Sequence, residues 1–158
     1  LPGHLELVEG ILSAQEGHAA ASHETMEAMI EHVRSAVGEE VELLHDVHER
    51  LSPIDAVQFA KDVEQYRLFF LEDLLAPEDI EWFETIRNQC ATPLAMGELF
   101  NNPHEWRTLV TDRLIDFVRM HVSQIGGLTP ARNAAAENGM PSRVSYALGS
   151  ALSYRTTD

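Results

Sequence analysis

The sequence is poor in basic residues and cysteine, and it contains no long apolar run. Eleven Lys and Arg residues against 26 Asp and Glu residues give a formal net charge of −15. Because so negative a surface repels phosphate backbones and anionic lipid heads, we expect neither a nucleic acid nor a membrane as partner. Cys90 is the only cysteine, so no internal disulfide can form. With no secretory signal pattern at the start, the chain is expected in the cytoplasm.

Several motifs of common enzyme classes are missing too. The sequence has no G-x-G-x-x-G or Walker pattern, no H-x-x-x-H pair and no nucleophile elbow. No apolar run approaches the ~18 residues of a membrane-spanning helix. These absences leave a globular domain whose chemistry must come from its polar side chains.

Helices and short apolar runs alternate along the chain. The spacing of apolar residues predicts a helix from about Ser22 to Val37, and cap signals such as Asn102-Pro103-His104-Glu105 open further helices. Strands are predicted at 41–46, 67–72, 93–98 and 116–120, with further candidates at 143–147 and 4–8. This alternation indicates an α/β fold with a parallel sheet, and both an open doubly wound sheet and a (β/α) barrel satisfy it.

Three carboxylates close successive predicted strands at equal intervals. Asp46, Glu72 and Glu98 are each 26 residues apart, since 46 + 26 = 72 and 72 + 26 = 98. The carboxyl ends of parallel strands lie on one side of a sheet, so we expect the three side chains to meet there. Oxygen ligands of this kind suit Mg²⁺. Any one of them taken alone is more often an ordinary loop residue or helix cap.

Other polar side chains are expected near the same edge. His48, two residues beyond Asp46, would face the same pocket if the chain stayed extended, either as a proton carrier or ligand or as an exposed loop histidine. Arg119 and His121 leave the fourth strand at i and i+2, where a cation could grip a substrate, although Arg119 could equally serve a salt bridge. Zinc bound by His45, Asp46 and His48 is a weaker alternative.

Five segments carry a resemblance to a known family. They are Leu44-His45-Asp46-Val47-His48-Glu49-Arg50-Leu51, Tyr66-Arg67-Leu68-Phe69-Phe70-Leu71-Glu72-Asp73, Pro93-Leu94-Ala95-Met96-Gly97-Glu98-Leu99-Phe100-Asn101, Asp116-Phe117-Val118-Arg119-Met120-His121 and Gln124-Ile125-Gly126-Gly127-Leu128-Thr129-Pro130. Together they resemble the barrel of the mannonate dehydratase group, also called starvation-sensing proteins, in the enolase superfamily.

The resemblance implies a function and a role for each site residue. It implies that Asp46, Glu72 and Glu98 hold Mg²⁺, that His48 is the general acid and that Arg119 contacts a sugar acid. The reaction would be dehydration of a sugar acid such as D-mannonate to a 2-keto-3-deoxy acid.

The chain also departs from the family. Residues 1–22 lack the Tyr and Arg of the family's general base, no His-Gly-Pro motif follows His121, and 158 residues are too few for a complete barrel of ~250. We therefore expect a partial barrel of about five to six units over 23–147, an N-terminal segment 1–22 of unclear role and a tail over 148–158. Its free sheet edges predict a homo-oligomer or cover by a terminal segment. The alternative function is a catalytically incompetent relative that binds a ligand or partner.

Overall fold

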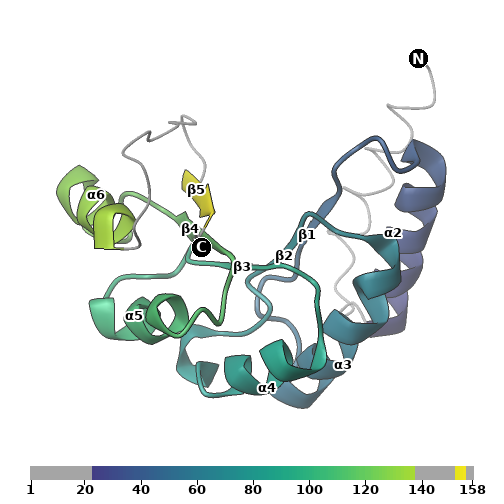
Figure 1. Ribbon diagram of the computed structural model, residues 1–158, viewed down its shortest axis with the longest axis horizontal. Helices are drawn as coiled ribbons and strands as arrows, with labels where there is room; N and C mark the ends of the chain where they lie inside the picture. The colour runs from purple at the N-terminus through teal and green to yellow at the C-terminus, as the bar shows by residue number, and fades with distance from the viewer. Residues whose placement is uncertain (1–22, 138–151, 156–158) are drawn as a thin grey trace.

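The computed structural model describes residues 23–137 and 152–155 as a curved sheet with helices along its outer side (Figure 1). The strands are β1 (Leu44–Asp46), β2 (Phe70–Glu72), β3 (Leu94–Met96), β4 (Phe117–Met120) and β5 (Leu152–Arg155). The helices are α2 (His23–Val37), α3 (Pro53–Asp62), α4 (Trp82–Gln89), α5 (Pro103–Thr111) and α6 (Leu128–Glu137), with short 3₁₀ turns η1 (Val63–Tyr66) and η2 (Pro77–Asp79).

The strands follow the order β1-β2-β3-β4-β5, and the first four run parallel. Each parallel connection contains a helix, which is the repeating unit of a (β/α) barrel. The parallel β/α arrangement predicted from the sequence, part of a barrel, is confirmed. Four such strands are seen in the described ranges, and the candidate strands at 143–147 and 4–8 lie outside them.

Proline and short polar residues set the helix starts as the sequence predicts. Asn102 caps α5 in a capping box, because its side chain accepts a bond from the His104 amide while the Glu105 carboxylate accepts the Asn102 amide at 3.1 Å. Ser52 caps α3, with Pro53 at the first helical position. These two helices, α3 and α5, therefore begin at a fixed point after β1 and β3.

The four parallel strands begin one to three residues later than predicted, and β3 also ends two residues earlier. Arg67 has a left-handed backbone (φ 52°), which ends η1 and delays β2 until Phe70. Beyond β3, Gly97 has φ +142° and leaves the extended conformation. Isolated positive-φ residues of this kind leave no periodic signal in the sequence, so strand ends were misplaced by one to three residues.

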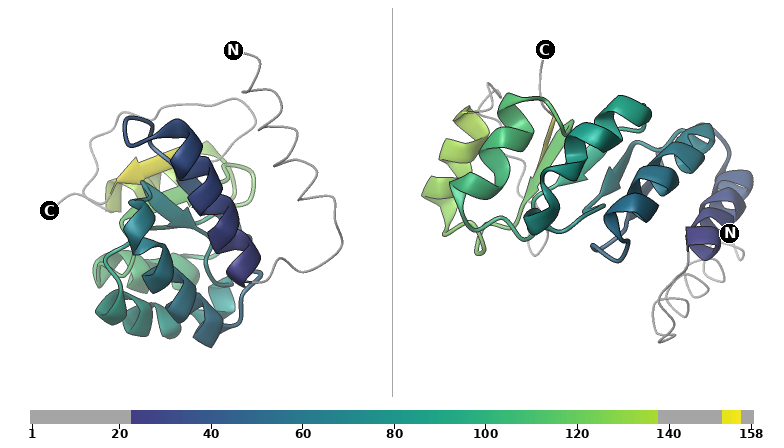
Figure 2. Two further views of the ribbon diagram at one scale, coloured as in Figure 1. Left: turned by 90° about the vertical axis from the view of Figure 1, so that its right-hand side faces the viewer. Right: turned by 90° about the horizontal axis from the view of Figure 1, so that it is seen from below.

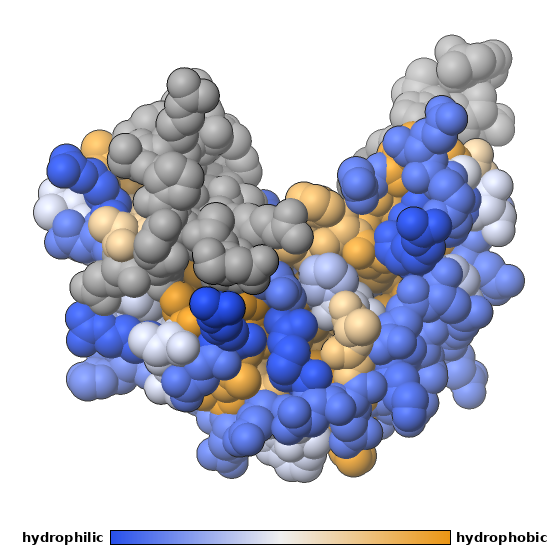
Figure 3. All heavy atoms as spheres, viewed as in Figure 1, coloured by the Kyte–Doolittle hydropathy of each residue, from blue (hydrophilic) through white to orange (hydrophobic). Residues whose placement is uncertain are grey.

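The two faces of the sheet differ because side chains alternate along each strand. Leu71, Leu94, Met96, Val118 and Met120 belong to the main core, which lies beneath the helices. The opposite face carries a small separate cluster of Phe70, Ala95 and Phe117. Figure 2 shows the helices gathered on one side of the strands, and Figure 3 shows orange apolar side chains at the base of the hollow beside α2. This second face corresponds to the interior of the barrel.

The last described strand was not expected. β5 pairs antiparallel with β4, with Val118 opposite Tyr154, although the sequence analysis placed residues 148–158 in a tail. The pairing covers the β4 edge with a terminal segment, one of the two outcomes expected for an incomplete barrel. Within the described residues β1 has a strand on one side only. Self-association through that edge stays a prediction.

Arg34 joins α2 to the start of the sheet. Its buried guanidinium donates to the backbone carbonyls of Tyr66, Gly38, Val41 and Arg67 at 2.8–3.1 Å. The four bonds fix the loop that leads into β1 against the loop that leads into β2. None of the described helices is long and apolar enough to span a membrane.

Candidate metal and active site

Two of the three equally spaced carboxylates are direct neighbours in the sheet. Asp46 and Glu72 are the last residues of β1 and β2 and lie opposite each other in the parallel register. Glu72 also lies opposite Ala95, whereas Glu98 follows the end of β3 by two residues. The expectation that all three occupy the same position of their units is therefore wrong for Glu98. The turn at Gly97 nevertheless brings Glu98 back toward Asp46.

Asp46, His48 and Glu98 form a tight cluster at the carboxyl edge of the sheet. One oxygen of each carboxylate and one His48 ring nitrogen all lie within 4.8 Å of one another. His48 Nδ1 lies 2.8 Å from Asp46 Oδ2, and the His48 amide donates to Asp46 Oδ1 at 3.1 Å. The chain is not extended here, as the sequence analysis assumed, because His48 has φ 55°. A tight turn, held by the Asp46 side chain, places the imidazole.

The surroundings of His48 favour its protonated form. The hydrogen bond to Asp46 is the main cause that raises the pKa of His48, and the negative charges of Asp46, Glu98 and Asp73 act in the same direction. Because Nδ1 faces Asp46, Nε2 is the nitrogen that remains to donate a proton. A protonated His48 imidazole could therefore donate a proton from Nε2.

Glu72 and Arg119 form an ion pair on the inner face of the sheet. Arg119 Nη1 donates to Glu72 Oε2, and the guanidinium also lies 5.7 Å from the centre of the Phe70 ring. Burial raises the pKa of Glu72 to about 7, and the negative charges of Asp46 and Glu98 add to that effect while Arg119 opposes it. The structure therefore places Glu72 in the electrostatic field of the Asp46 cluster, with Arg119 as its direct partner.

Two other histidines near the strand ends, His45 and His121, contact residues outside the cluster of Asp46, His48 and Glu98. His121 shares a 2.7 Å hydrogen bond between its Nδ1 and Ser123 Oγ. His45 lies on the helix side of β1, with its ring edge against Phe59 at 6.0 Å between centroids. Burial lowers the pKa of His45. Since His45 and Asp46 are adjacent in a strand and point to opposite faces, the alternative zinc site on His45, Asp46 and His48 is not supported.

Asp73 is a buried carboxylate that the sequence analysis missed. It follows Glu72 in a left-handed conformation (φ 42°) and is 2% exposed. Its Oδ1 accepts the Gly97 amide at 3.2 Å, and its backbone bonds both to Glu49 and to Ala95. Asp73 therefore ties together the loops that follow β1, β2 and β3. An Asp directly after a strand-end Glu was the available signal, but the turn that buries it cannot be read from spacing.

The substitution Asp73→Asn should stabilise the metal-free chain at alkaline pH. Burial raises the pKa of Asp73 from its ordinary 3.8 to about 7. The unfolded chain releases this proton at a lower pH than the folded chain does, so the folded state loses stability as the pH rises from 3.8 to about 7. Asparagine never ionises and keeps an oxygen for the Gly97 amide. We expect the variant to gain about 1–3 kcal/mol in free energy of unfolding at about pH 8 and almost nothing at about pH 4.

Urea unfolding at both pH values, in the presence of EDTA, measures this difference. The matched control is Asp112→Asn, because Asp112 is exposed at the end of α5. An equal gain at both pH values would contradict the burial of an ionising Asp73 carboxylate.

Known proteins share both sequence and fold with this chain. Residues 10–139 match the family of enolase C-terminal domain-like proteins. A D-galactonate dehydratase family member from Enterococcus gallinarum (strain EG2) is 55% identical over 108 residues, which are 68% of this chain and 27% of that protein. A D-mannonate dehydratase from Caulobacter sp. (strain K31) is 45% identical over 108 residues, with the same coverage of 68% and 27%.

Solved structures of other proteins also share the fold of this chain. The crystal structure of an enolase from Pantoea ananatis with bound D-gluconate and Mg is 50% identical, with a TM-score of 0.70 over 72% of this chain and 28% of that one. A mandelate racemase/muconate lactonizing enzyme-like protein from Rubrobacter xylanophilus is 34% identical, with a TM-score of 0.66 over 75% of this chain and 31% of that one.

The match is strong but covers a limited part of the relatives. The chain spans about a quarter of the length of the curated relatives it matches. Their names include both galactonate and mannonate dehydratases, so the superfamily predicted from the motifs is confirmed and the narrower mannonate group is not singled out. With the fold, the strand-end acids and the match over residues 10–139 in agreement, the chain belongs to the enolase C-terminal domain-like family.

Proposed function

We propose that this chain carries the metal and acid-catalytic part of a Mg²⁺-dependent sugar-acid dehydratase. The observation that carries the proposal is the cluster of Asp46, His48 and Glu98 at the carboxyl edge of the sheet, beside the Glu72–Arg119 pair. In (β/α) barrels this edge holds the active site. Dehydratase names among the relatives support the same reaction class.

The donor set suits Mg²⁺. Asp46, Glu72 and Glu98 offer carboxylate oxygens, the hard ligands that this ion prefers. Glu72 is buried among like charges, a conflict that a bound divalent cation would relieve. We propose these three residues as the ligands, with Glu72 exchanging part of its contact with Arg119. When bound, Mg²⁺ supplies positive charge where negative charge develops on the carboxylate end of the substrate.

His48 and Arg119 would act on the substrate directly. Dehydration breaks the bond between C3 and its hydroxyl, and a proton from His48 Nε2 lets the hydroxyl leave as water. Asp46 holds the imidazole through Nδ1 at 2.8 Å and favours its protonated state. Arg119 contacts the sugar acid, oriented by Glu72 and Phe70, and His121 is proposed as a further contact. The base that removes the proton at C2 is not assigned to any described residue.

The proposed substrates are D-mannonate or a related acid of the D-gluconate type, and the product is a 2-keto-3-deoxy sugar acid. A solved relative holds D-gluconate and Mg, which supports this substrate class. A cytoplasmic location is part of the proposal. The buried free thiol of Cys90 is in keeping with it, because a reducing compartment keeps thiols free.

A direct assay of keto-acid formation tests the activity. The 158-residue chain is incubated with D-mannonate, D-gluconate or D-galactonate, with Mg²⁺ or with EDTA, and the keto acid is measured by a coupled enzyme. Mg²⁺-dependent product from at least one acid supports the proposal. Absence of product at every enzyme concentration would refute catalysis by this chain. Sugar-acid binding without product would favour the alternative of a catalytically incompetent relative.

The substitution Glu98→Gln should weaken Mg²⁺ binding by about 10–100-fold, because a neutral amide replaces a charged oxygen ligand. Isothermal titration calorimetry of both proteins gives the dissociation constants. The control is Glu84→Gln, since Glu84 is exposed on α4 and is not part of the cluster. Equal weakening in the two variants would indicate a general charge effect rather than a ligand.

A further inference from the structure

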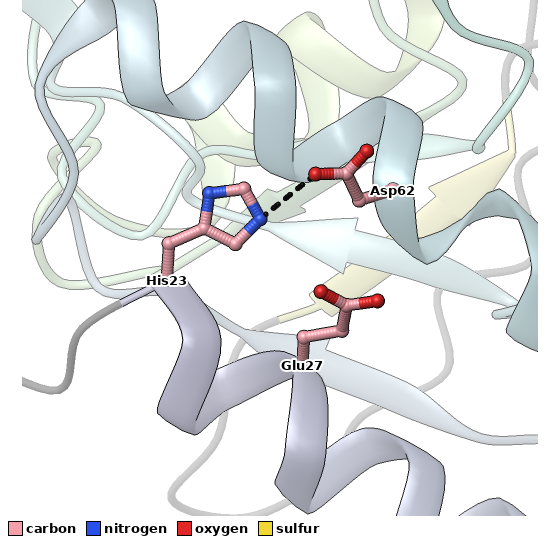
Figure 4. Close-up of side chains that lie close together, drawn as sticks. All are labelled: His23, Glu27 and Asp62. Atoms are coloured by element: carbon pink, nitrogen blue, oxygen red, sulfur yellow. Dashed lines mark ion pairs between the residues drawn. The ribbon is translucent and has the colours of Figure 1, made fainter.

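A second cluster of ligand-type side chains lies between α2 and the end of α3, outside the site described above. His23 and Glu27 are one helical turn apart on α2, and Asp62 is the last residue of α3. Figure 4 shows the three side chains pointing toward one another. One ligand atom from each lies within 4.8 Å of the other two, and His23 Nε2 is 3.1 Å from Asp62 Oδ2.

Neighbouring residues fix the orientation of the histidine and the aspartate. The His23 ring packs edge-on against Phe59, with 5.3 Å between the ring centroids and 88° between the planes. Phe59 is fully buried, so the ring has a rigid support that directs Nε2 toward Asp62. Gln58 Nε2 donates to Asp62 Oδ1 at 2.7 Å, which leaves Oδ2 for the cluster.

Hydrogen bonds from neighbouring residues also hold the Glu27 carboxylate. Its Oε1 accepts from the Tyr66 hydroxyl at 3.3 Å and from Gln65 Nε2 at 3.4 Å. Outer hydrogen bonds of this kind orient the ligands of metal centres and keep their lone pairs aimed inward. The three side chains are thus supported by different partners and point toward one another in Figure 4.

The donor set and the spacing favour a transition metal over Mg²⁺. Imidazole nitrogen and carboxylate oxygen are both ligands that Zn²⁺ binds in proteins, whereas Mg²⁺ prefers oxygen alone. Two ligands at 2.0–2.2 Å from one tetrahedral ion lie about 3.3–3.6 Å apart, close to the 3.1 Å between His23 and Asp62. An open surface cavity of about 600 Å³, lined by Glu27, Lys61, Asp62, Glu64 and Gln65, borders two of the three side chains, so solvent reaches Glu27 and Asp62.

We propose that His23, Glu27 and Asp62 bind one Zn²⁺ ion, which links α2 to the end of α3. The site is separate from the Asp46 cluster, because its residues come from the helices on the outer side of the sheet. Its role is structural: the ion holds α2 in place, and α2 in turn fixes the loop that leads into β1 through Arg34.

Zinc titration of the full 158-residue chain tests the proposal. Calorimetry is run with Zn²⁺ in excess Mg²⁺, so that the Asp46 cluster is occupied by the other ion. We expect one equivalent of Zn²⁺ to bind and His23→Gln to weaken that binding at least about tenfold. The midpoint of thermal unfolding should rise with Zn²⁺ in the wild-type chain but not in His23→Gln.

Three further variants make the outcome decisive. His32→Gln lies on the exposed side of the same helix and should bind as the wild type does. His48→Gln should also retain the zinc-dependent rise in the unfolding midpoint, which separates the two clusters. Asp62→Asn repeats the test without touching the His23–Phe59 contact, in case His23→Gln unfolds. Zinc binding that survives both His23→Gln and Asp62→Asn, or that is lost only in His48→Gln, would overturn the proposal.

Discussion

The substitution Gly97→Ala should lower the free energy of unfolding by about 3–5 kcal/mol. We expect this loss to exceed that of an alanine substitution at any other described glycine. A Cβ at this position would lie 2.6 Å from the Arg119 carbonyl oxygen and 3.0 Å from the Phe100 ring. The φ of +142° adds backbone strain for any residue with a side chain. Overpacking and strain each cost about 1–3 kcal/mol, and here they act together.

Gly38 provides the matched control. It also has a positive φ, +74°, but a Cβ there would meet no atom within 4 Å. Gly38→Ala should therefore cost only about 1 kcal/mol, from the backbone alone. Urea unfolding followed by circular dichroism measures both variants. Similar losses at the two positions would show that the close approach of β4 to Gly97 does not determine the cost.

The substitution His48→Asn should lower the rate of keto-acid formation by about 10²–10⁴-fold, which is the usual contribution of a positioned general acid. Asparagine cannot carry a proton to the leaving hydroxyl at neutral pH. Asp46 and Glu98 remain in place as oxygen ligands, so Mg²⁺ affinity should change far less than the rate. The comparison of rate with affinity separates an acid from a ligand.

The control for this experiment is His104→Asn, since His104 is exposed on α5. It should leave the rate unchanged. A loss of Mg²⁺ affinity as large as the loss of rate would reassign His48 as a metal ligand, which its place in the cluster with Asp46 and Glu98 would also permit. An unchanged rate would refute any role in the reaction.

Local chemistry made the element order predictable from the sequence. Pro53 and Pro103 at first helical positions, with Ser52 and Asn102 before them, mark helix starts that depend on a few adjacent residues. The alternation of such helices with apolar runs then implies the parallel sheet. Strand ends were less predictable, because they depend on left-handed residues such as Arg67.

The candidate site was predictable as a set of residues but not as a geometry. Equal spacing pointed to Asp46, Glu72 and Glu98, yet the sheet register aligns only the first two, and Glu98 reaches the cluster through the turn at Gly97. The ion pair between Glu72 and Arg119 joins strands 47 residues apart, which no local pattern encodes. The burial of Asp73 likewise depends on tertiary packing.

We propose that Asp46, Glu72 and Glu98 hold one ion jointly, and anomalous diffraction from crystals grown with Mn²⁺ in place of Mg²⁺ tests this most directly. We predict one anomalous peak at the carboxyl edge of the sheet, with oxygens of all three carboxylates among its ligands at about 2.1–2.3 Å. A peak bound by Asp46, His48 and Glu98 with Glu72 still paired to Arg119, or no peak at this edge, would contradict the account.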